Sequence, residues 1–300
     1  MNVLITGASG FLGSRLAHRW HGLGHDVGLL MRPTSSLARV RGLDHKVDIA
    51  RCSDDSDTIA MVQRLRPDLV LHAACSYGRA GERHLDLFDT NVRLGMVILQ
   101  ALADLGRNTS FLNMGTALGP EVNAYALSKH QFVQWGRIFA TQQATGMSFV
   151  NLRLQHMYGP GDDKTKFTSQ VLHCCHANKP VLDLTVGDQV RDFVYIDDAV
   201  AALAAIADQR AKFGATADIE VGSGAAHTIR EFAMAAQRLT HSTTRLNFGA
   251  IPYRASEVMH SVADVRALSA LGWRPAFDLE SGLRRYIALE FTPPLRPAGA

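Results

Sequence analysis

Long hydrophobic segments are missing from this sequence of 300 residues, and so are the spacings with which cysteine and histidine bind metals. No apolar run approaches the length of a membrane-spanning helix, and the chain starts in a strand-like segment without the charged and apolar regions of a signal peptide. The four cysteines lack metal-ligand spacing, and the thirteen histidines form no HExxH pattern. We therefore expect a cytoplasmic protein with no membrane partner and no metal site.

A strong charge of either sign is also absent, because the net charge is only +3. Such a small and dispersed charge argues against nucleic acid as a partner, although it suits an anionic small molecule. Repeats and low-complexity tracts are missing as well. The 47% of hydrophobic residues are enough for one large or two small packed units.

Apolar strand candidates alternate with longer helical patterns in the first half of the chain. The candidates are residues 3–5, 26–31, 69–72, 110–114 and 148–152. This alternation predicts an α/β fold, a Rossmann doubly wound parallel sheet with a smaller, mixed α/β C-terminal substrate-binding lobe. We expect the dinucleotide-binding domain at 1–157 and about 190–213, the lobe at about 158–189 and 214–292, and a loose tail at 293–300.

Three glycines follow the first apolar segment with the spacing GxxGxxG. Gly7 supplies backbone freedom for a sharp turn from strand to helix. Gly10 leaves room for a pyrophosphate at the helix N-terminus, and Gly13 allows the helix and the strand to pack closely. The alternative is a glycine-rich turn without a chemical role, but the position directly after a strand predicts dinucleotide binding.

The end of the predicted second strand indicates which dinucleotide binds. NAD-selective sites place an acidic side chain there for the ribose hydroxyls, whereas this chain has Met31 and Arg32. A guanidinium suits a 2′-phosphate, and Ser35 adds a hydroxyl nearby. We therefore expect NADP(H) as the cofactor, the alternative being that Arg32 is an ordinary solvated loop charge.

Tyr125 and Lys129 lie four residues apart, so on a helix their side chains share one face. A tyrosine with its ordinary pKa of about 10 is a poor acid or base at neutral pH, and a nearby ammonium is expected to lower that pKa. A pair on a helix surface is the alternative. The glycine motif upstream favours a catalytic pair instead.

Several longer segments resemble one known family. In chain order they are TGASGFLG, RPDLVLHAA, NVRLG, YALSK, LRLQHMYGPGDD, RDFVYIDDAV and ADVRALSALGWRP. Together they span nearly the whole chain and resemble the extended short-chain dehydrogenase/reductases of the NAD-dependent epimerase/dehydratase family, which act on nucleotide sugars. The run around Tyr125 also resembles the CDP-abequose and CDP-paratose synthases of this family, which are NADPH-dependent 4-ketoreductases. The resemblance further implies a homodimer.

The resemblance assigns the catalytic roles. It implies that Tyr125 protonates the developing alkoxide at sugar C4, that Lys129 lowers the pKa of Tyr125 and binds ribose, and that a Ser or Thr at the end of a strand bonds the same oxygen. An ungapped alignment puts Met114 at that last position, so we assign the role to Thr116, the nearby hydroxyl. Dehydratases of the family carry an Asp-Glu pair after this residue, whereas this chain has Ala117-Leu118. We therefore do not expect 4,6-dehydration.

The resemblance also implies the binding residues. Those for the cofactor are Gly7, Ser9, Gly10, Phe11, Leu12, Gly13, Arg32, Ser35, Asp48, Ile49, His72, Ala73, Ala74, Asn91, Tyr125, Lys129 and Leu152. Those for the substrate are His156, Arg191 and Arg254, of which the arginines suit a diphosphate. The alternative for these two is that they are surface arginines beside Asp192 and Glu257.

These observations predict an NADPH-dependent reductase of a nucleotide-linked 4-keto-6-deoxyhexose, with CDP favoured as the nucleotide, in deoxysugar and surface polysaccharide biosynthesis. Three alternatives stay open: a nucleotide-sugar C4 epimerase that retains NAD, an NADPH reductase of a non-nucleotide ketone, and a non-catalytic protein that senses dinucleotides. Met31 and Arg32 argue against the epimerase, and Arg191 and Arg254 argue against the non-nucleotide ketone.

Overall fold

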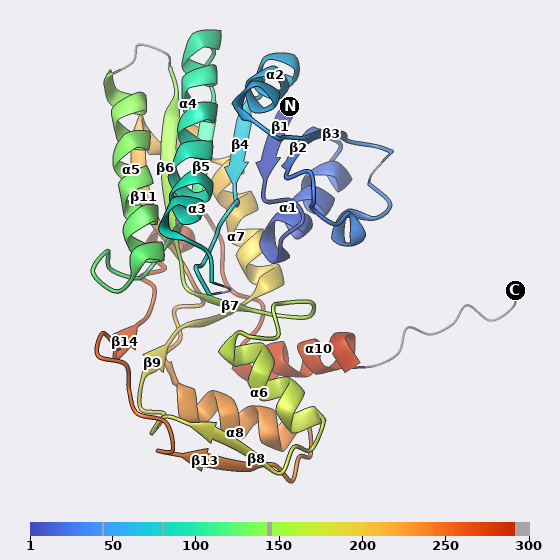
Figure 1. Ribbon diagram of the computed structural model, residues 1–300, viewed down its shortest axis with the longest axis vertical. Coiled ribbons are helices and arrows are strands. Elements are labelled where there is room, and N and C mark those ends of the chain that lie inside the picture. Colours follow the sequence, from blue (N-terminus) through green and yellow to red (C-terminus); the bar gives the residue numbers. More distant parts are fainter. Residues whose placement is uncertain (44, 80, 143–145, 292–300) are drawn as a thin grey trace, which may run out of the picture. The chain divides into compact units, whose positions relative to one another are not determined.

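The computed structural model describes residues 1–43, 45–79, 81–142 and 146–291, and its chain forms two compact units (Figure 1). Unit 1 contains residues 1–154, 200–221 and 264–273, and unit 2 contains 155–199, 222–263 and the chain from 274 on. These boundaries differ from the expected ones, because residues 216–221 add a strand to the sheet of unit 1 and residues 190–199 lie in unit 2. The predicted loose tail, 293–300, lies outside the described residues.

Unit 1 is built on a seven-stranded sheet in the order β11-β6-β5-β4-β1-β2-β3, and every neighbouring pair is parallel. The strands are β1 (Asn2–Thr6), β2 (Asp26–Met31), β3 (Asp48–Arg51), β4 (Leu69–His72), β5 (Ser110–Thr116), β6 (Ser148–Leu154) and β11 (Thr216–Val221). The predicted Rossmann fold is thereby confirmed, although β3 and β11 were not among the predicted strands. The strand order reverses between β1 and β4, and ligands of such sheets bind beyond the carboxyl ends of the strands at this point.

Helices cover both faces of this sheet. They are α1 (Phe11–Gly22), η1 (Ala38–Val40), α2 (Asp55–Leu65), α3 (His84–Phe88), the π-helical turn η2 (Asp89–Arg93), α4 (Leu94–Leu105), α5 (Ala124–Gln142), α7 (Ile196–Asp208), η3 (Arg210–Phe213) and α9 (Arg266–Ala270). Figure 1 shows α2, α4 and α5 over one face of the sheet and α7 behind it. The first residues of α7 belong to unit 2 and the rest to unit 1.

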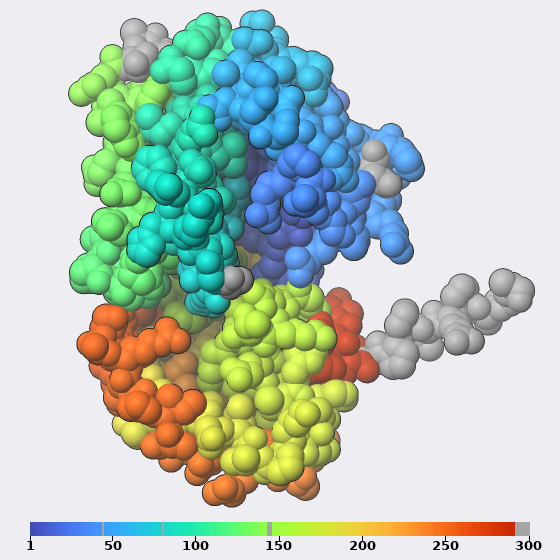
Figure 2. Space-filling view, in the orientation of Figure 1, coloured from blue at the N-terminus to red at the C-terminus, as the bar shows by residue number. Residues whose placement is uncertain are grey.

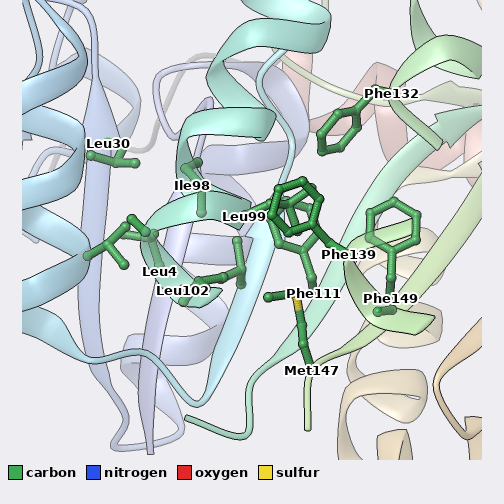
Figure 3. Packing of buried hydrophobic residues seen from close by; sticks show 14 of the residues in the cluster. Leu4, Leu30, Ile98, Leu99, Leu102, Phe111, Phe132, Phe139, Met147 and Phe149 are labelled. Carbon is green, nitrogen blue, oxygen red and sulfur yellow. The ribbon is translucent and has the colours of Figure 1, made fainter. Parts of the chain in front are cut away.

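An aromatic cluster fixes α5 against the sheet (Figure 3). The rings of Phe111 and Phe149 stack with centroids 5.5 Å apart, and Phe132 of α5 meets the Phe149 ring edge-on at 5.9 Å. The helix approaches closely because Gly136 has no side chain, since a Cβ there would lie 2.1 Å from the Phe149 ring. Such tight burial fixes the helix that carries Tyr125 and Lys129.

Unit 2 is a small mixed lobe. Its strands are β7 (His156–Tyr158), β8 (Val181–Leu184), β9 (Val190–Arg191), β10 (Phe193–Tyr195), β12 (His227–Thr228), β13 (Arg245–Phe248) and β14 (His260–Ser261), and its helices are α6 (Phe167–His176), α8 (Ile229–Leu239) and α10 (Leu279–Phe291). The buried carboxylate of Asp192 joins three of its segments, accepting hydrogen bonds from the backbone of Ser223, Gly224 and Ala263 at 2.7, 2.9 and 3.2 Å. This bonding compensates for the loss of hydration of the carboxylate.

Candidate functional site

The glycine turn between β1 and α1 has the geometry that dinucleotide binding requires. Gly7 has φ +67°, and a Cβ there would lie 2.7 Å from the backbone of Ala73 and Ala74 after β4. A Cβ on Gly13 would lie 2.2 Å from the Gly7 carbonyl oxygen, so close packing of helix and strand needs glycine here. Gly10 is the N-cap of α1 and presents no capping side chain. The helix N-terminus thus offers backbone N–H groups to an anion without a side chain in the way.

The remaining predicted residues of this turn have clear structural places. Leu12 is a buried residue of α1. Phe11, at the first position of the helix, is half-buried, and the guanidinium carbon of Arg15 lies 5.3 Å from the centre of its ring. The carbonyl of Ser9 accepts a hydrogen bond from Nη1 of Arg39 at 3.2 Å. The sequence analysis missed Arg39, because nothing in the local pattern indicates that η1 folds back onto the glycine turn.

The turn after β2 is rich in guanidinium groups. Arg32 is exposed and forms a turn in which its carbonyl accepts from the Ser35 N–H at 3.0 Å. Arg51 at the end of β3 holds this turn, donating to the carbonyls of Pro33 and Ser35 at 2.7 and 3.2 Å. With Arg39, three arginines surround the region where the sequence predicts a 2′-phosphate.

Asp48 and Ile49 do not reach the carboxyl edge of the sheet. Asp48 starts β3 opposite Gly28, and both of its carboxylate oxygens accept from Arg64 on α2, at 2.8 and 3.0 Å. Ile49 is half-buried opposite Leu29. The structure therefore differs from the expected adenine contact, because the residue next to the edge is Cys52, whose N–H donates to the Met31 carbonyl at 2.8 Å.

His72 at the end of β4 is a core residue. Oγ1 of Thr6 accepts the Ala74 N–H at 3.0 Å and is hydrogen-bonded to Nδ1 of His72, also at 3.0 Å, in a direction set by the tautomer of the imidazole. Burial, together with the charge of Lys129, lowers the pKa of His72 to about 3. The imidazole is therefore neutral, and it is the backbone of Ala73 and Ala74 that packs against Gly7.

Thr116 and Tyr125 interact. Thr116 is the last residue of β5, and hydrogen bonding by its side chain acts to lower the pKa of Tyr125. Met114, the competing position, is buried within the strand. Tyr125 lies in the first turn of α5, which Asn123 caps by accepting the Ala126 N–H at 2.8 Å.

The electrostatics of Tyr125 differ from the prediction. Burial raises the pKa of Tyr125 well above its ordinary value, and Cys75 and Tyr77 act in the same direction, whereas the hydrogen bond with Thr116 lowers it. The loss of hydration thus raises the pKa of Tyr125 by more than the ammonium group of Lys129, on the next helical turn, was expected to lower it. The phenol keeps its proton at neutral pH, which suits a proton donor.

Lys129 is buried in the sheet-facing side of α5, only 1% exposed. Burial lowers the pKa of its ammonium group. Within the described ranges its Nζ atom has no hydrogen-bond partner. A buried donor without a partner is costly, so this atom is a binding position for an acceptor such as a ribose hydroxyl.

Asn91 serves as a connector beside the site. It lies in the π-helical turn η2, a distortion that is common at functional sites. Its amide accepts the Ser76 N–H at 2.8 Å and donates to the Ser76 carbonyl and to Oγ of Ser128, both at 2.9 Å. Asn91 therefore ties the loop after β4 to the residue that precedes Lys129, and these contacts occupy both ends of its amide.

Leu152 is also a core residue. It is fully buried in β6 opposite Met114, two residues before the end of the paired strands. Its side chain packs inside the sheet layer. Its backbone pairs with β5 and β11, and a Cβ on Gly115 would lie 3.1 Å from its carbonyl oxygen.

The predicted substrate residues lie in unit 2. Arg191 is buried rather than at the surface, and it donates to Glu257 at 2.6 Å while Arg254 stays exposed. Glu257 also bonds the backbone of Arg254, because its N–H donates to the Arg254 carbonyl at 3.1 Å. His156 is exposed at the start of β7, with its ring 6.1 Å from that of Phe193.

Metal-binding and membrane-spanning features are missing from the described part of the chain. It contains no group of three His, Cys, Asp or Glu side chains placed to hold a metal ion. None of its helices has the length and apolar character required to cross a membrane.

Comparisons with known proteins agree with this geometry. A model of the NAD dependent epimerase/dehydratase family matches residues 3–222. The chain is 31% identical over 301 residues to the CDP-abequose synthase of Salmonella typhimurium (strain LT2), covering 95% of this chain and 97% of that protein. It is 29% identical to the CDP-abequose synthase of Salmonella muenchen, covering 96% and 97%. The solved UDP-glucose 4-epimerase of Thermus thermophilus in complex with NAD is 25% identical with a TM-score of 0.82, covering 96% and 98%.

Proposed function

Because this chain belongs to the NAD dependent epimerase/dehydratase family, we propose that it is an NADPH-dependent reductase of a nucleotide-linked 4-keto-6-deoxyhexose. A CDP-linked sugar is the favoured substrate, and the product serves deoxysugar and surface polysaccharide biosynthesis in the cytoplasm. The observation that carries the proposal is the buried Lys129, whose Nζ has no partner among the described residues, one turn from Tyr125 on α5, with Thr116 acting on the same tyrosine from the end of β5. The relatives named CDP-abequose synthase support the choice of a CDP-linked sugar.

The residues of unit 1 fit a bound dinucleotide. A Cβ at Gly7 or Gly13 would collide with backbone atoms, so the turn needs glycine there, and the N-terminus of α1 suits a pyrophosphate. Arg32 and Arg39 favour NADP(H), because guanidinium groups pair with the 2′-phosphate that distinguishes it from NAD(H). When bound, NADPH supplies the hydride that reduces the sugar carbonyl.

The side chains of the site perform the proton transfer. Thr116 donates a hydrogen bond to the carbonyl oxygen, where negative charge develops. Oγ1 of Thr116 accepts the Leu118 N–H at 3.2 Å, and the same hydroxyl interacts with Tyr125. Tyr125 then gives its proton to that oxygen, and Lys129 binds the nicotinamide ribose.

The arginines of unit 2 supply diphosphate recognition. Glu257 orients Arg191 by accepting its hydrogen bond. Arg254 begins the short turn that ends at Glu257. Charge-assisted bonds from two guanidinium groups suit the two phosphates of a nucleotide sugar. His156 adds a polar group for the sugar.

We also propose a homodimer. Three large apolar side chains of α5 are exposed, namely Leu127, Trp135 and Ile138, at 46%, 45% and 39%. Figure 2 shows that α3, α4 and α5, in cyan to green, lie on an open face of unit 1. Contact between copies of this face would remove these side chains from water. Analytical sedimentation of the wild type and of Trp135→Glu tests the proposal. We expect a dimer for the wild type and a shift toward monomer for the variant, and a monomeric wild type contradicts the proposal.

The decisive test is cofactor titration followed by turnover. We expect the purified protein to bind NADPH more tightly than NADH and to oxidise one NADPH for each CDP-4-keto-6-deoxyglucose reduced. A C4 epimerase, the second candidate, is favoured by the similarity to the NAD-bound 4-epimerase. It would instead hold NAD and give no net oxidation.

Tyr125→Phe tests the proton donor. We expect kcat to fall by at least about a hundredfold, the lower range for general acid catalysis, while NADPH affinity stays the same. Tyr77→Phe is the matched control, because it also removes one hydroxyl and keeps the ring that lies 5.0 Å from Tyr125. Equal losses in both variants would contradict the assigned role.

A further inference from the structure

Arg51, the last residue of β3, holds the turn that follows β2. Its Nη1 atom donates to the carbonyl oxygens of Pro33 and Ser35, at 2.7 and 3.2 Å. The strand register places Arg51 opposite Met31, the last residue of β2. The end of β3 therefore fixes the backbone on both sides of Arg32.

No carboxylate in the described part of the chain compensates the charge of Arg51. Exposed arginines elsewhere in unit 1 pair with acidic side chains, as Arg64 does with Asp48 at 2.8 Å. Arg51 is also exposed, yet within the described ranges it donates to backbone carbonyls and forms no ion pair. The side chain of Arg32 likewise has no hydrogen bond or ion pair among the described residues. Two such guanidinium groups at one turn create a positive potential that suits an anion.

The chain between β2 and β3 adds to this potential. Residues 32–43 contain Arg32, Arg39 and Arg41 and no Asp or Glu. Arg39 donates to the Ser9 carbonyl at 3.2 Å, so this loop lies beside the glycine turn. The adenosine ribose of a bound dinucleotide adjoins its pyrophosphate, so an anion on that ribose would lie near the turn at Arg32.

We propose that Arg51 is a positioning residue for the 2′-phosphate of NADP(H), acting through the turn that presents Arg32. This role rests on the proposed cofactor and identifies the residue that prepares its site. It does not depend on which carbonyl compound is reduced.

The two bonds of Arg51 act on Arg32 in two ways. They occupy the carbonyls of Pro33 and Ser35, which are neighbouring backbone acceptors for the Arg32 guanidinium. They also fix the turn, so Arg32 loses less conformational freedom when it pairs with a phosphate. Without Arg51, the turn is less restricted and its carbonyls compete with the phosphate for Arg32.

Calorimetric titration with two nucleotides isolates the contribution of the 2′-phosphate. Adenosine 2′,5′-bisphosphate differs from 5′-AMP only by this group, so the ratio of the two affinities measures its recognition. We expect the wild type to prefer the bisphosphate. Arg51→Ala should lower the bisphosphate affinity at least about fivefold and leave the 5′-AMP affinity unchanged. A merely structural role would weaken the binding of both nucleotides equally and would overturn the proposal.

Two further variants separate positioning from charge. Arg51→Lys should retain most of the preference, because a single nitrogen donates both bonds in the protein and an ammonium nitrogen can do the same. Arg41→Ala is the matched control, since it removes the same charge from the same exposed loop. Its bisphosphate affinity should stay within about twofold of wild type, because salt screens exposed charges. Equal losses in Arg41→Ala and Arg51→Ala would indicate an effect of general charge and overturn the proposal.

A double-mutant cycle shows whether Arg51 acts through Arg32. We expect Arg32→Ala and the double variant Arg32→Ala with Arg51→Ala to lose the preference for the bisphosphate equally. The reason is that without the guanidinium of Arg32 nothing is left for Arg51 to position. Additive losses would mean that Arg51 acts independently of Arg32, and they would overturn the proposal.

The outcomes also separate the role of Arg51 from the proposed function. If the wild type binds both nucleotides equally, the proposed NADP(H) specificity fails, and the role of Arg51 fails with it. If Arg32→Ala loses the preference and Arg51→Ala keeps it, only the role of Arg51 fails. The titrations need no turnover, so they decide the role of Arg51 even for a protein without reductase activity.

Discussion

Replacing Thr116 by Val removes one hydroxyl and keeps the shape of the side chain. In the folded protein the hydroxyl accepts one long hydrogen bond, from the Leu118 N–H at 3.2 Å, and contacts Tyr125. Loss of such a neutral bond costs about 1 kcal/mol of unfolding free energy. Loss of a donor to the developing oxyanion costs more, about 3–4 kcal/mol of transition-state stabilisation, or a roughly 10²–10³-fold lower kcat. The two effects therefore differ enough to be measured separately.

The assay compares urea unfolding, NADPH affinity and kcat in wild type, Thr116→Val and Thr116→Ser. We expect the Val variant to bind NADPH normally, lose about 1 kcal/mol of stability and lose at least about a hundredfold in kcat. The Ser variant keeps the hydroxyl and should stay within about tenfold of wild type. If the Val variant turns over as fast as the Ser variant, Thr116 does not stabilise the oxyanion, and the assignment of the third catalytic residue fails.

Further expectations concern the supports of the site. Asn91→Ala removes three hydrogen bonds of a fully buried side chain and should lower the unfolding free energy by about 2–4 kcal/mol and reduce kcat. Asn247→Ala loses only two exposed bonds and should do neither, and equal unfolding curves for the two variants would contradict this. Gly13→Ala forces a Cβ to 2.2 Å from a carbonyl oxygen and should abolish NADPH binding in a fluorescence titration, while Gly22→Ala in the same helix, with nothing within 4 Å, should bind normally. Arg32→Ala should weaken NADPH about tenfold or more and leave NADH unchanged by calorimetry; a parallel loss for both cofactors would exclude a 2′-phosphate contact.

Short-range rules predicted much of unit 1 from the sequence. The turn at Gly7 has the positive φ that its glycine suggests, and five of the seven strands coincide with apolar segments between helical patterns. These features depend on residues close together in the chain. Edge strands are harder to predict: β3 has the half-exposed pattern of Asp48–Arg51, and β11 comes from a distant segment that the boundary prediction gave to the other unit.

The sequence analysis missed Arg39, because that residue is placed by a contact distant in sequence. Arg39 meets the glycine turn 30 residues earlier in the chain. The pKa of Tyr125 likewise depends on how much water the folded chain excludes, which the spacing to Lys129 does not encode. The residue types and their spacing therefore predicted the pair Tyr125 and Lys129, but they did not predict the direction in which the pKa of Tyr125 is shifted.

The π-helical turn at Asp89–Arg93 sets the angular phase between α3 and α4. An α-helix advances about 100° per residue, so the wider turn shifts every later side chain by roughly that angle relative to an uninterrupted helix. A chain one residue shorter here would keep its glycines, its strands and Tyr125, yet it would rotate Asn91 away from the loop after β4. The length of this turn is thus itself under constraint, because a single deletion would break the link that Asn91 makes between Ser76, after β4, and Ser128, beside Lys129, while leaving the catalytic side chains intact.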